Sequence, residues 1–476
     1  MKRLFVLISI SLTVFTVFKC SAQDVLLKIN LRGVYESKIT LLPLIGPKAL
    51  QPLVEKDNIK EGEIVTLSVS NSQLPAEFVL RFDYKEKETS APYPAEKRIV
   101  INNQNLELWV NPPYCNNNDS TWFQKEEREN RLIVSFFKGN NRRKEKIMLL
   151  QNFLLNYDNI QSKFYQLGIV EYEKQRNNYN NWIIAQSKEN SNLFVSHTFR
   201  FQYVPLIDFK GNEEVRRQHI TEHYFDGIDF SDTLLVRTSG LKEWITSYVN
   251  IFGAISNNES MRDSLVILAG KNAIEKAKVG HPKVYGWMVD YFYAGYEAFG
   301  IKKGTVMLQQ YLDNPNCLTS KKQQIIKRLE GMAKLVVGTQ APDFRLNCID
   351  GSAFDFHAFK GTSKYKLLLF WSADCAHCQQ LVSRIKSWYN ETGNKEKLDI
   401  VAVSLDDTET EVPKWEKATV DLPEWKHLRA KGGVNSVVAN DYAILSTPVM
   451  FLIDSFTNII IAVPDTLEQL MVALEK

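Results

Sequence analysis

The feature that most constrains the fold of this 476-residue chain is an uninterrupted apolar run, Leu367–Trp371, that is followed closely by Cys375 and Cys378. A continuous apolar run of this length indicates a strand that is buried on both faces, as in a parallel sheet. Residues 376–390 then repeat apolar side chains at helical spacing. The two cysteines therefore lie at a strand-to-helix junction, and Cys375 is predicted at the N-terminus of the helix.

This junction suits a reactive cysteine pair. Unpaired backbone N–H groups and the helix dipole favour a thiolate at Cys375, which is therefore the predicted nucleophile. Cys378 follows about one turn later, within reach to form a ring disulfide and to resolve a mixed disulfide. A protonated His377 would stabilise the thiolate and the carboxylate of Asp374 would disfavour it, so their effects on the redox potential oppose each other.

Two structural alternatives exist for the cysteine pair, namely a static disulfide and half of a zinc site. A zinc site needs two further ligands, commonly a second cysteine pair at suitable spacing, and the sequence contains no such pair. We therefore predict no metal.

The residues after the junction complete a recognisable order of elements. A second buried strand, a hairpin-like pair and a closing helix are predicted at 400–405, 449–453 with 459–463, and 467–474. Strand, helix, strand, hairpin and helix in this order are typical of the thioredoxin fold. Thr447-Pro448 precedes the hairpin, where a cis bond would expose the backbone of Thr447 for pairing with a substrate; an ordinary trans turn proline is the alternative.

The rest of the chain divides by its periodicity. Alternating apolar and polar residues predict an N-terminal, β-sandwich-like domain over 23–115, and helical spacing predicts a middle α-helical domain over 120–335. The α/β thioredoxin-like domain is expected over 338–476. Three domains agree with the length, because single cores stop growing near about 250–300 residues.

The N-terminus has the pattern of an export signal. Met1-Lys2-Arg3 is followed by an apolar stretch and by small residues up to Ala22, which predicts a signal peptide over 1–22 and export to the periplasm or cell envelope. Lipid anchoring through Cys20 is the alternative, although Lys19 is unsuited to the lipoprotein signal. Five cysteines remain after cleavage, an odd number that suits disulfide exchange better than structural cross-linking; Cys115, Cys317 and Cys348 are predicted to be buried or incidental.

The formal net charge of +3 and the single mixed run Arg142–Lys146 argue against a nucleic-acid partner, which needs a clustered cationic surface.

Residues 338–476 resemble the TlpA/ResA-type extracytoplasmic thiol–disulfide oxidoreductases, which are related to the redoxin/AhpC-TSA group. The motifs are Ala341–Phe344 as an opening strand, Leu369–Trp371 leading to the cysteines, Val401–Asp406, and Thr447-Pro448 before Phe451–Asp454. The resemblance implies an enzyme without a cofactor that reduces disulfide-containing protein substrates with electrons from a membrane thiol donor. It also places Trp371, Thr447 and Pro448 at the substrate. Residues 219–249 resemble the helical segment of large multidomain envelope members.

The chain lacks the buried carboxylate that related proteins keep near the cysteine pair. Positions 369 and 381, where related proteins keep a buried carboxylate, are leucines, so His377 or Asp374 would have to accept the proton. Leu368 stands where peroxiredoxins need proline, which argues against peroxidase activity.

Other functions stay open. His377 favours an oxidase or isomerase, and a binding protein whose cysteines hold Cu(I) is a further alternative. His219–His223 also matches the H-x-x-E-H pattern of zinc peptidases, with Glu297 at a plausible distance for a third ligand, but so short a pattern arises readily by chance.

Overall fold

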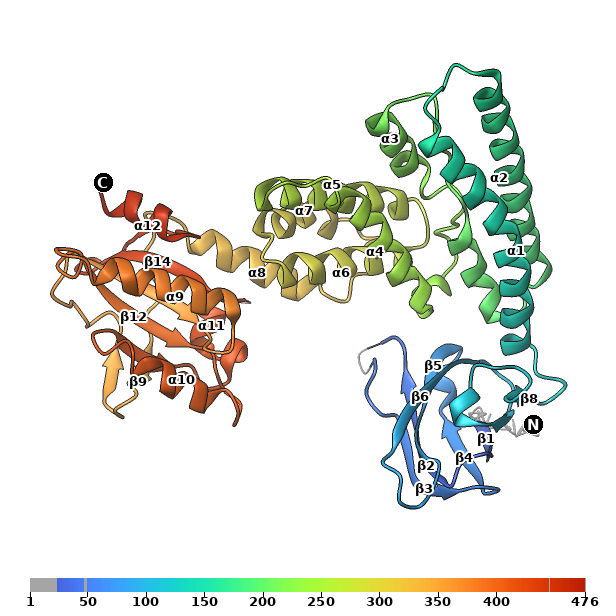
Figure 1. Ribbon diagram of the computed structural model, residues 1–476. Coiled ribbons are helices and arrows are strands. Elements are labelled where there is room, and N and C mark those ends of the chain that lie inside the picture. Colours follow the sequence, from blue (N-terminus) through green and yellow to red (C-terminus); the bar gives the residue numbers. More distant parts are fainter. Residues whose placement is uncertain (1–23, 47–48, 445, 476) are drawn as a thin grey trace, which may run out of the picture. The chain divides into compact units, whose positions relative to one another are not determined.

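The computed structural model describes residues 24–46, 49–444 and 446–475 (Figure 1). The predicted signal peptide lies outside these ranges. Two compact units divide the described chain: residues up to Ile228 together with Thr233–Ile245, and Asp229–Asp232 together with the residues from Thr246 onward. The division falls inside a helix of the middle region, and the three domain boundaries stay a prediction.

The N-terminal region is a pair of four-stranded sheets. Their strand orders are β4-β1-β7-β8 and β3-β2-β5-β6. The strands are β1 Val25–Leu31, β2 Glu36–Pro43, β3 Val54–Lys60, β4 Ile64–Val69, β5 Ala76–Lys85, β6 Tyr93–Ile101, β7 Leu106–Val110 and β8 Trp122–Phe123. Burial alternates along β1, β4 and β7, so each strand turns one face to a shared core that contains Leu27, Leu67 and Phe82. The predicted sandwich-like module is confirmed.

The first sheet continues past residue 115, where the sequence pattern of the sandwich ends. Residues Trp122 and Phe123 pair with β7, and the ring of Trp122 stacks on Trp109 with centroids 6.4 Å apart. Two residues are too few to show an alternating pattern, which is why this strand escaped the sequence analysis.

The middle region is helical, as predicted. Its helices are α1 Glu129–Asn156, α2 Lys163–Glu189, α3 Glu213–His223, α4 Ser239–Gly253, α5 Glu259–Lys278, α6 Pro282–Ala298, α7 Lys302–Leu312 and α8 Lys322–Lys334. Side chains of Ser162, Asn212 and Asn258 accept a backbone hydrogen bond at the N-termini of α2, α3 and α5. Within the described part of the chain, no helix combines the length and hydrophobicity that a bilayer crossing requires.

The C-terminal region is a mixed five-stranded sheet of order β13-β12-β11-β14-β15. β11 runs parallel to β12 and antiparallel to β14. The elements are β11 Tyr365–Trp371, α9 Ala376–Tyr389, β12 Leu398–Ser404, α10 Val412–Thr419, β13 Lys426–Arg429, α11 Val437–Asp441, β14 Val449–Asp454, β15 Ile460–Ala462 and α12 Leu467–Leu474. All seven residues of β11 are buried, because apolar layers cover both faces of the sheet. The predicted thioredoxin-like order is confirmed.

The opening strand is displaced from its predicted position. Residues 341–344 form no strand, and the sheet-forming segments are β9 Arg345–Asn347 and β10 Ala353–Asp355, which pair with each other. Proline has no N–H to donate, so Pro342 interrupts any ladder there. Ala341 instead donates a single backbone hydrogen bond to Asn458.

Candidate active site

The cysteine pair lies where β11 ends and α9 begins. Cys375 is the N-cap residue of α9, with extended backbone angles, and its sulfur accepts a hydrogen bond from the N–H of Cys378 at 3.3 Å. One of the donors that a helix N-terminus leaves unpaired therefore points at the sulfur of Cys375. Cys375 is partly exposed, whereas Cys378 has no exposed surface.

Burial sets the chemistry of Cys378. Desolvation raises the pKa of its thiol well above the ordinary value, and the hydrogen bond with Cys375 raises it further. Hydrogen bonds from the Thr447 side chain and the Ser372 backbone act in the opposite direction. The thiol of Cys378 therefore stays protonated in the resting site. Thr447 and Ser372 are the neighbours whose hydrogen bonds favour its thiolate.

The loop before β14 faces the pair. The Thr447–Pro448 peptide bond is cis, as the sequence predicts. The Cys375 sulfur donates to the Thr447 carbonyl at 3.6 Å, so one residue contacts both sulfurs through different groups. Cys375, Cys378, Thr447 and Pro448 are thus brought together from segments about 70 residues apart.

Trp371 lies on the core side of the site. Its side chain is 1% exposed and belongs to the apolar cluster that contains Cys378. Its side chain therefore packs in the core together with Cys378, and the predicted role of Trp371 at the substrate stays a prediction. Leu369 and Leu381, the two positions that lack the family's carboxylate, are buried in the same cluster.

The two predicted tuning residues have different surroundings. Asp374 forms an ion pair with Lys414 of α10, with Nζ and Oδ1 2.5 Å apart, and both side chains are about half exposed. His377 is exposed in the first turn of α9. The sequence analysis missed Lys414, because nothing local connects two residues that are forty positions apart.

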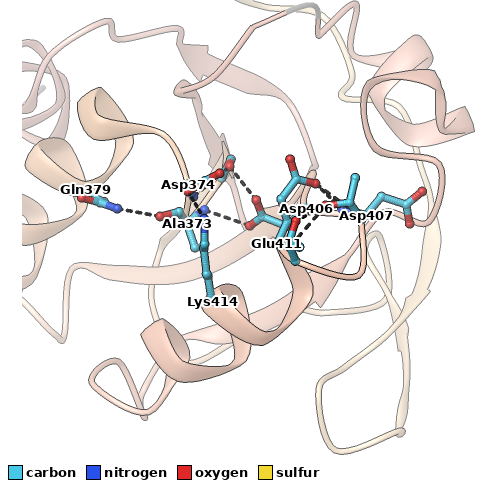
Figure 2. A network of polar contacts seen from close by, with 10 residues as sticks. Ala373, Asp374, Gln379, Asp406, Asp407, Glu411 and Lys414 are labelled. Carbon is cyan, nitrogen blue, oxygen red and sulfur yellow. Dashed lines mark hydrogen bonds and ion pairs between the residues drawn. The ribbon is translucent and has the colours of Figure 1, made fainter. Parts of the chain in front are cut away.

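A second residue that the sequence analysis did not assign to the site is Asp406, which follows β12 and is 1% exposed. Its carboxylate accepts hydrogen bonds from the hydroxyls of Ser372 and Ser404 and from the N–H of Ala373, at 2.5, 2.7 and 2.8 Å. Figure 2 shows this network around the loop that leads to Cys375. A sequence signal existed, since polar residues after adjacent parallel strands meet at the carboxyl edge of a sheet.

The remaining motifs lie elsewhere. His219 and His223 share α3, where the glutamate between them, Glu222, accepts from Gln218, and His223 contacts Asp226 at 2.7 Å. Glu297 instead binds Thr305 and pairs with Arg328. Within the described ranges, no group of three or more His, Cys, Asp or Glu side chains is placed to hold a metal ion.

The other described cysteines are outside the site. Cys115, Cys317 and Cys348 are free thiols, of which the first two are buried. Burial raises the pKa of Cys115 and of Cys317, which disfavours a reactive thiolate at both positions.

Comparison with known proteins agrees with this geometry. The thioredoxin-like family matches residues 362–459. Proteins named thiol-disulfide oxidoreductase ResA from Bacillus thuringiensis and Bacillus cereus are each 30% identical over 146 residues, which covers 30% of this chain and 79% of theirs. A solved structure named thiol-disulfide oxidoreductase, from Bacteroides fragilis, is 27% identical over 29% of this chain and 98% of its own, with a TM-score of 0.25.

The cysteine pair at the end of β11, the sheet order and the two ResA relatives lead to one conclusion. Through a thioredoxin-like domain in its C-terminal third, the chain belongs to the ResA/TlpA-type thiol–disulfide oxidoreductases.

Proposed function

We propose that the C-terminal domain reduces disulfides of protein substrates. The Cys375 thiolate attacks one sulfur of the substrate disulfide, and the other substrate sulfur leaves as a thiolate and takes a proton. Cys378 then attacks Cys375 in the mixed disulfide and releases the second substrate thiol. The substrate gains two electrons, and the Cys375–Cys378 pair loses them to form a disulfide.

The observation that carries this proposal is the difference in access between the two sulfurs. Cys375 is partly exposed and its sulfur faces a backbone N–H at the start of α9, whereas Cys378 is fully buried behind it. A substrate disulfide reaches only the first sulfur, and the mixed disulfide then lies next to the second. This order of access corresponds to a nucleophilic and a resolving cysteine.

The loop at Thr447 supplies the substrate contact in this proposal. Its carbonyl lies 3.6 Å from the Cys375 sulfur, so an extended substrate segment that pairs with the Thr447 backbone would bring its disulfide to the nucleophile. The cis bond at Pro448 shapes this loop. Recognition through the backbone would accept many substrate sequences, because side chains would add only secondary contacts.

The proposed setting is the cell envelope. The N-terminal pattern of residues 1–22 supports export to the periplasm, either with signal cleavage or with an anchor on Cys20. Repeated turnover as a reductase needs an electron source, and we propose a membrane thiol donor that reduces the Cys375–Cys378 disulfide.

An oxidase or isomerase is the second candidate. His377 is exposed in the first turn of α9, next to Cys375, where a protonated imidazole would stabilise the reduced pair and make its disulfide more oxidising. The two candidates share the cysteine roles and differ in redox potential.

A trapping experiment tests the cysteine roles. A Cys378→Ser variant is expected to accumulate mixed disulfides with substrate proteins through Cys375, because the resolving thiol is absent. The matched Cys375→Ser variant should trap none, since Cys378 is buried. Complexes are read on non-reducing gels of envelope fractions, and their loss on thiol treatment confirms the linkage. Equal trapping by both variants, or none by either, would refute the assigned roles.

A further inference from the structure

Asp406 is a buried carboxylate that the mechanism above does not use. Only 1% of the residue is exposed, and its two oxygens accept three hydrogen bonds from Ser372, Ala373 and Ser404. Burying a carboxylate is costly unless such donors compensate it. Two of the three donors belong to the loop that leads to Cys375, so the carboxylate fixes this loop.

Asp406 lies next to this loop because the strands that precede the two segments, β11 and β12, end side by side. Trp371, the last residue of β11, pairs with Ser404, the last residue of β12. The chain then continues to Ser372 on one side and to Asp406 on the other. The Leu405 N–H also donates to the Trp371 carbonyl at 3.0 Å, which ties the two strand ends together. Asp406 therefore reaches the loop from the neighbouring strand.

Ser372 connects Asp406 to both cysteines. Its hydroxyl donates to Asp406 at 2.5 Å and accepts from the Asp374 N–H at 3.1 Å. Its carbonyl accepts from the Cys375 N–H at 3.3 Å. A hydrogen bond from the Ser372 backbone also lowers the pKa of the Cys378 thiol. Because only a donor stabilises a thiolate, we assign this bond to the Ser372 N–H.

We propose that Asp406 is a positioning residue for the resolving step: by fixing Ser372, it holds the Ser372 N–H against the Cys378 sulfur. This inference rests on the proposed function. In the resolving step, Cys378 gives its proton to solvent, and its thiolate attacks the sulfur of Cys375. The bond between Cys375 and the substrate sulfur breaks, and the substrate sulfur leaves with the electron pair and takes a proton.

The proposal explains how the site works without the family's usual acid. Leu369 and Leu381 offer no polar atom to Cys378, and burial opposes its ionisation. A fixed backbone donor stabilises the thiolate without placing a negative charge beside it. Asp406 thus acts on Cys378 through the loop, and it contacts neither sulfur in the proposed mechanism.

A two-phase reaction with dithiobis(nitrobenzoate) tests the proposal in the full chain. Attack by Cys375 releases one thionitrobenzoate, and resolution by Cys378 releases a second. The resolving phase is identified as the one that a Cys378→Ala variant lacks, which separates it from the other thiols. Asp406→Asn is compared with Asp407→Asn, whose carboxylate pairs with Arg429 at 3.5 Å and whose N–H donates to Glu411.

For Asp406→Asn we expect resolution about tenfold slower or more, because hydrogen bonds to a charged group are lost. The first phase should change less than about threefold. Raising the pH should restore much of the resolving rate, since the deficit lies in forming the Cys378 thiolate. Asp407→Asn should behave as wild type in both phases.

Several results would overturn the proposal. These are an unchanged resolving rate in Asp406→Asn, an equal slowing of both phases, or a resolving deficit that high pH does not relieve. If Asp406→Asn does not fold, Ser372→Ala decides, because it removes the hydroxyl that joins Ser372 to Asp406 and keeps both the carboxylate and its bond from the Ala373 N–H. It should slow the resolving phase selectively. A wild-type protein without a resolving phase would instead refute the proposed function.

Discussion

Cys375 and Cys378 are one helical turn apart, yet only Cys375 has access to solvent. The N-cap position turns the Cys375 sulfur toward the open end of α9, while Cys378 points into the core beside Leu381 and Trp371. Desolvation there raises the pKa of the Cys378 thiol. The same spacing thus produces one partly exposed and one buried sulfur.

This asymmetry predicts selective alkylation. Iodoacetamide at pH 8 should modify Cys375 in the native reduced protein and leave Cys378 unmodified, because Cys378 is buried and its thiol stays protonated. Peptide mass spectrometry before and after unfolding in urea measures both sites. In a Cys375→Ser variant, Cys378 should stay unmodified under native conditions. Rapid native labelling of Cys378 would contradict the account.

The sequence identified the residues of the site that are defined locally. The cysteine spacing and the strand-to-helix junction predicted Cys375 and Cys378. The cis bond at Pro448 was predicted from the place of Thr447-Pro448 in the thioredoxin-like order of elements. Asp406 and Lys414 were missed because their roles depend on which strands and helices become neighbours. That information lies in the sheet register and cannot be read from local spacing.

At the scale of a strand, β11 contains one buried cation. Lys366 is 0% exposed, and its ammonium donates to the carbonyls of Phe356 and Phe359 and to the Asn458 side chain at 2.7, 3.1 and 2.7 Å. These bonds join strand β11 to two loops. Burial nevertheless lowers the pKa of Lys366 to about 8.

The lowered pKa of Lys366 predicts that its contribution to the free energy of unfolding rises with pH. Between about pH 8 and 10.5, folded Lys366 is mostly neutral while the unfolded lysine keeps its proton, so at this site the unfolded state binds more protons. The contribution of Lys366 to the free energy of unfolding therefore rises with pH, relative to Lys366→Met. The rise is on the order of 3 kcal/mol. Urea unfolding across this range, compared with Lys366→Met and with the exposed Lys397→Met, measures it. An identical slope in Lys366→Met would show that another group causes the rise.

Two glycines of α6 differ in their surroundings. A Cβ on Gly286 would overlap the backbone of Leu318, whereas a Cβ on Gly295 would meet nothing within 4 Å. Gly286→Ala should therefore destabilise the protein by about 1–3 kcal/mol through overpacking. Gly295→Ala should stabilise it by up to ~1 kcal/mol, because glycine is a poor helix former. Thermal unfolding measures both, and similar shifts would contradict the close approach of α6 to Leu318.

Elements with a clear pattern of apolar residues, periodic or continuous, were predicted well. Helix α12 has its predicted bounds, and β11, α9 and β12 differ from theirs by one or two residues. The failures were at short or irregular segments. The opening strand was placed at 341–344, where Pro342 cannot join a ladder, and β8 has too few residues to show a pattern.

At the scale of the whole molecule, separate apolar cores stabilise separate parts. The sandwich has its own cluster, which includes Leu67, and the thioredoxin-like sheet has one cluster on each face. Among the described residues, those that hydrogen-bond the two cysteine sulfurs or the loop before them belong to the thioredoxin-like part. We therefore expect the redox chemistry to be a property of this domain.

The equilibrium redox potential of the Cys375/Cys378 pair, titrated against defined thiol buffers, tests the central claim most directly. A reductase predicts a value near or below about −250 mV, and Leu67→Ala in the sandwich core should leave it unchanged. A value near about −120 to −180 mV would contradict the reductase and identify an oxidase or isomerase. The absence of any reversible couple would contradict the enzymatic account altogether.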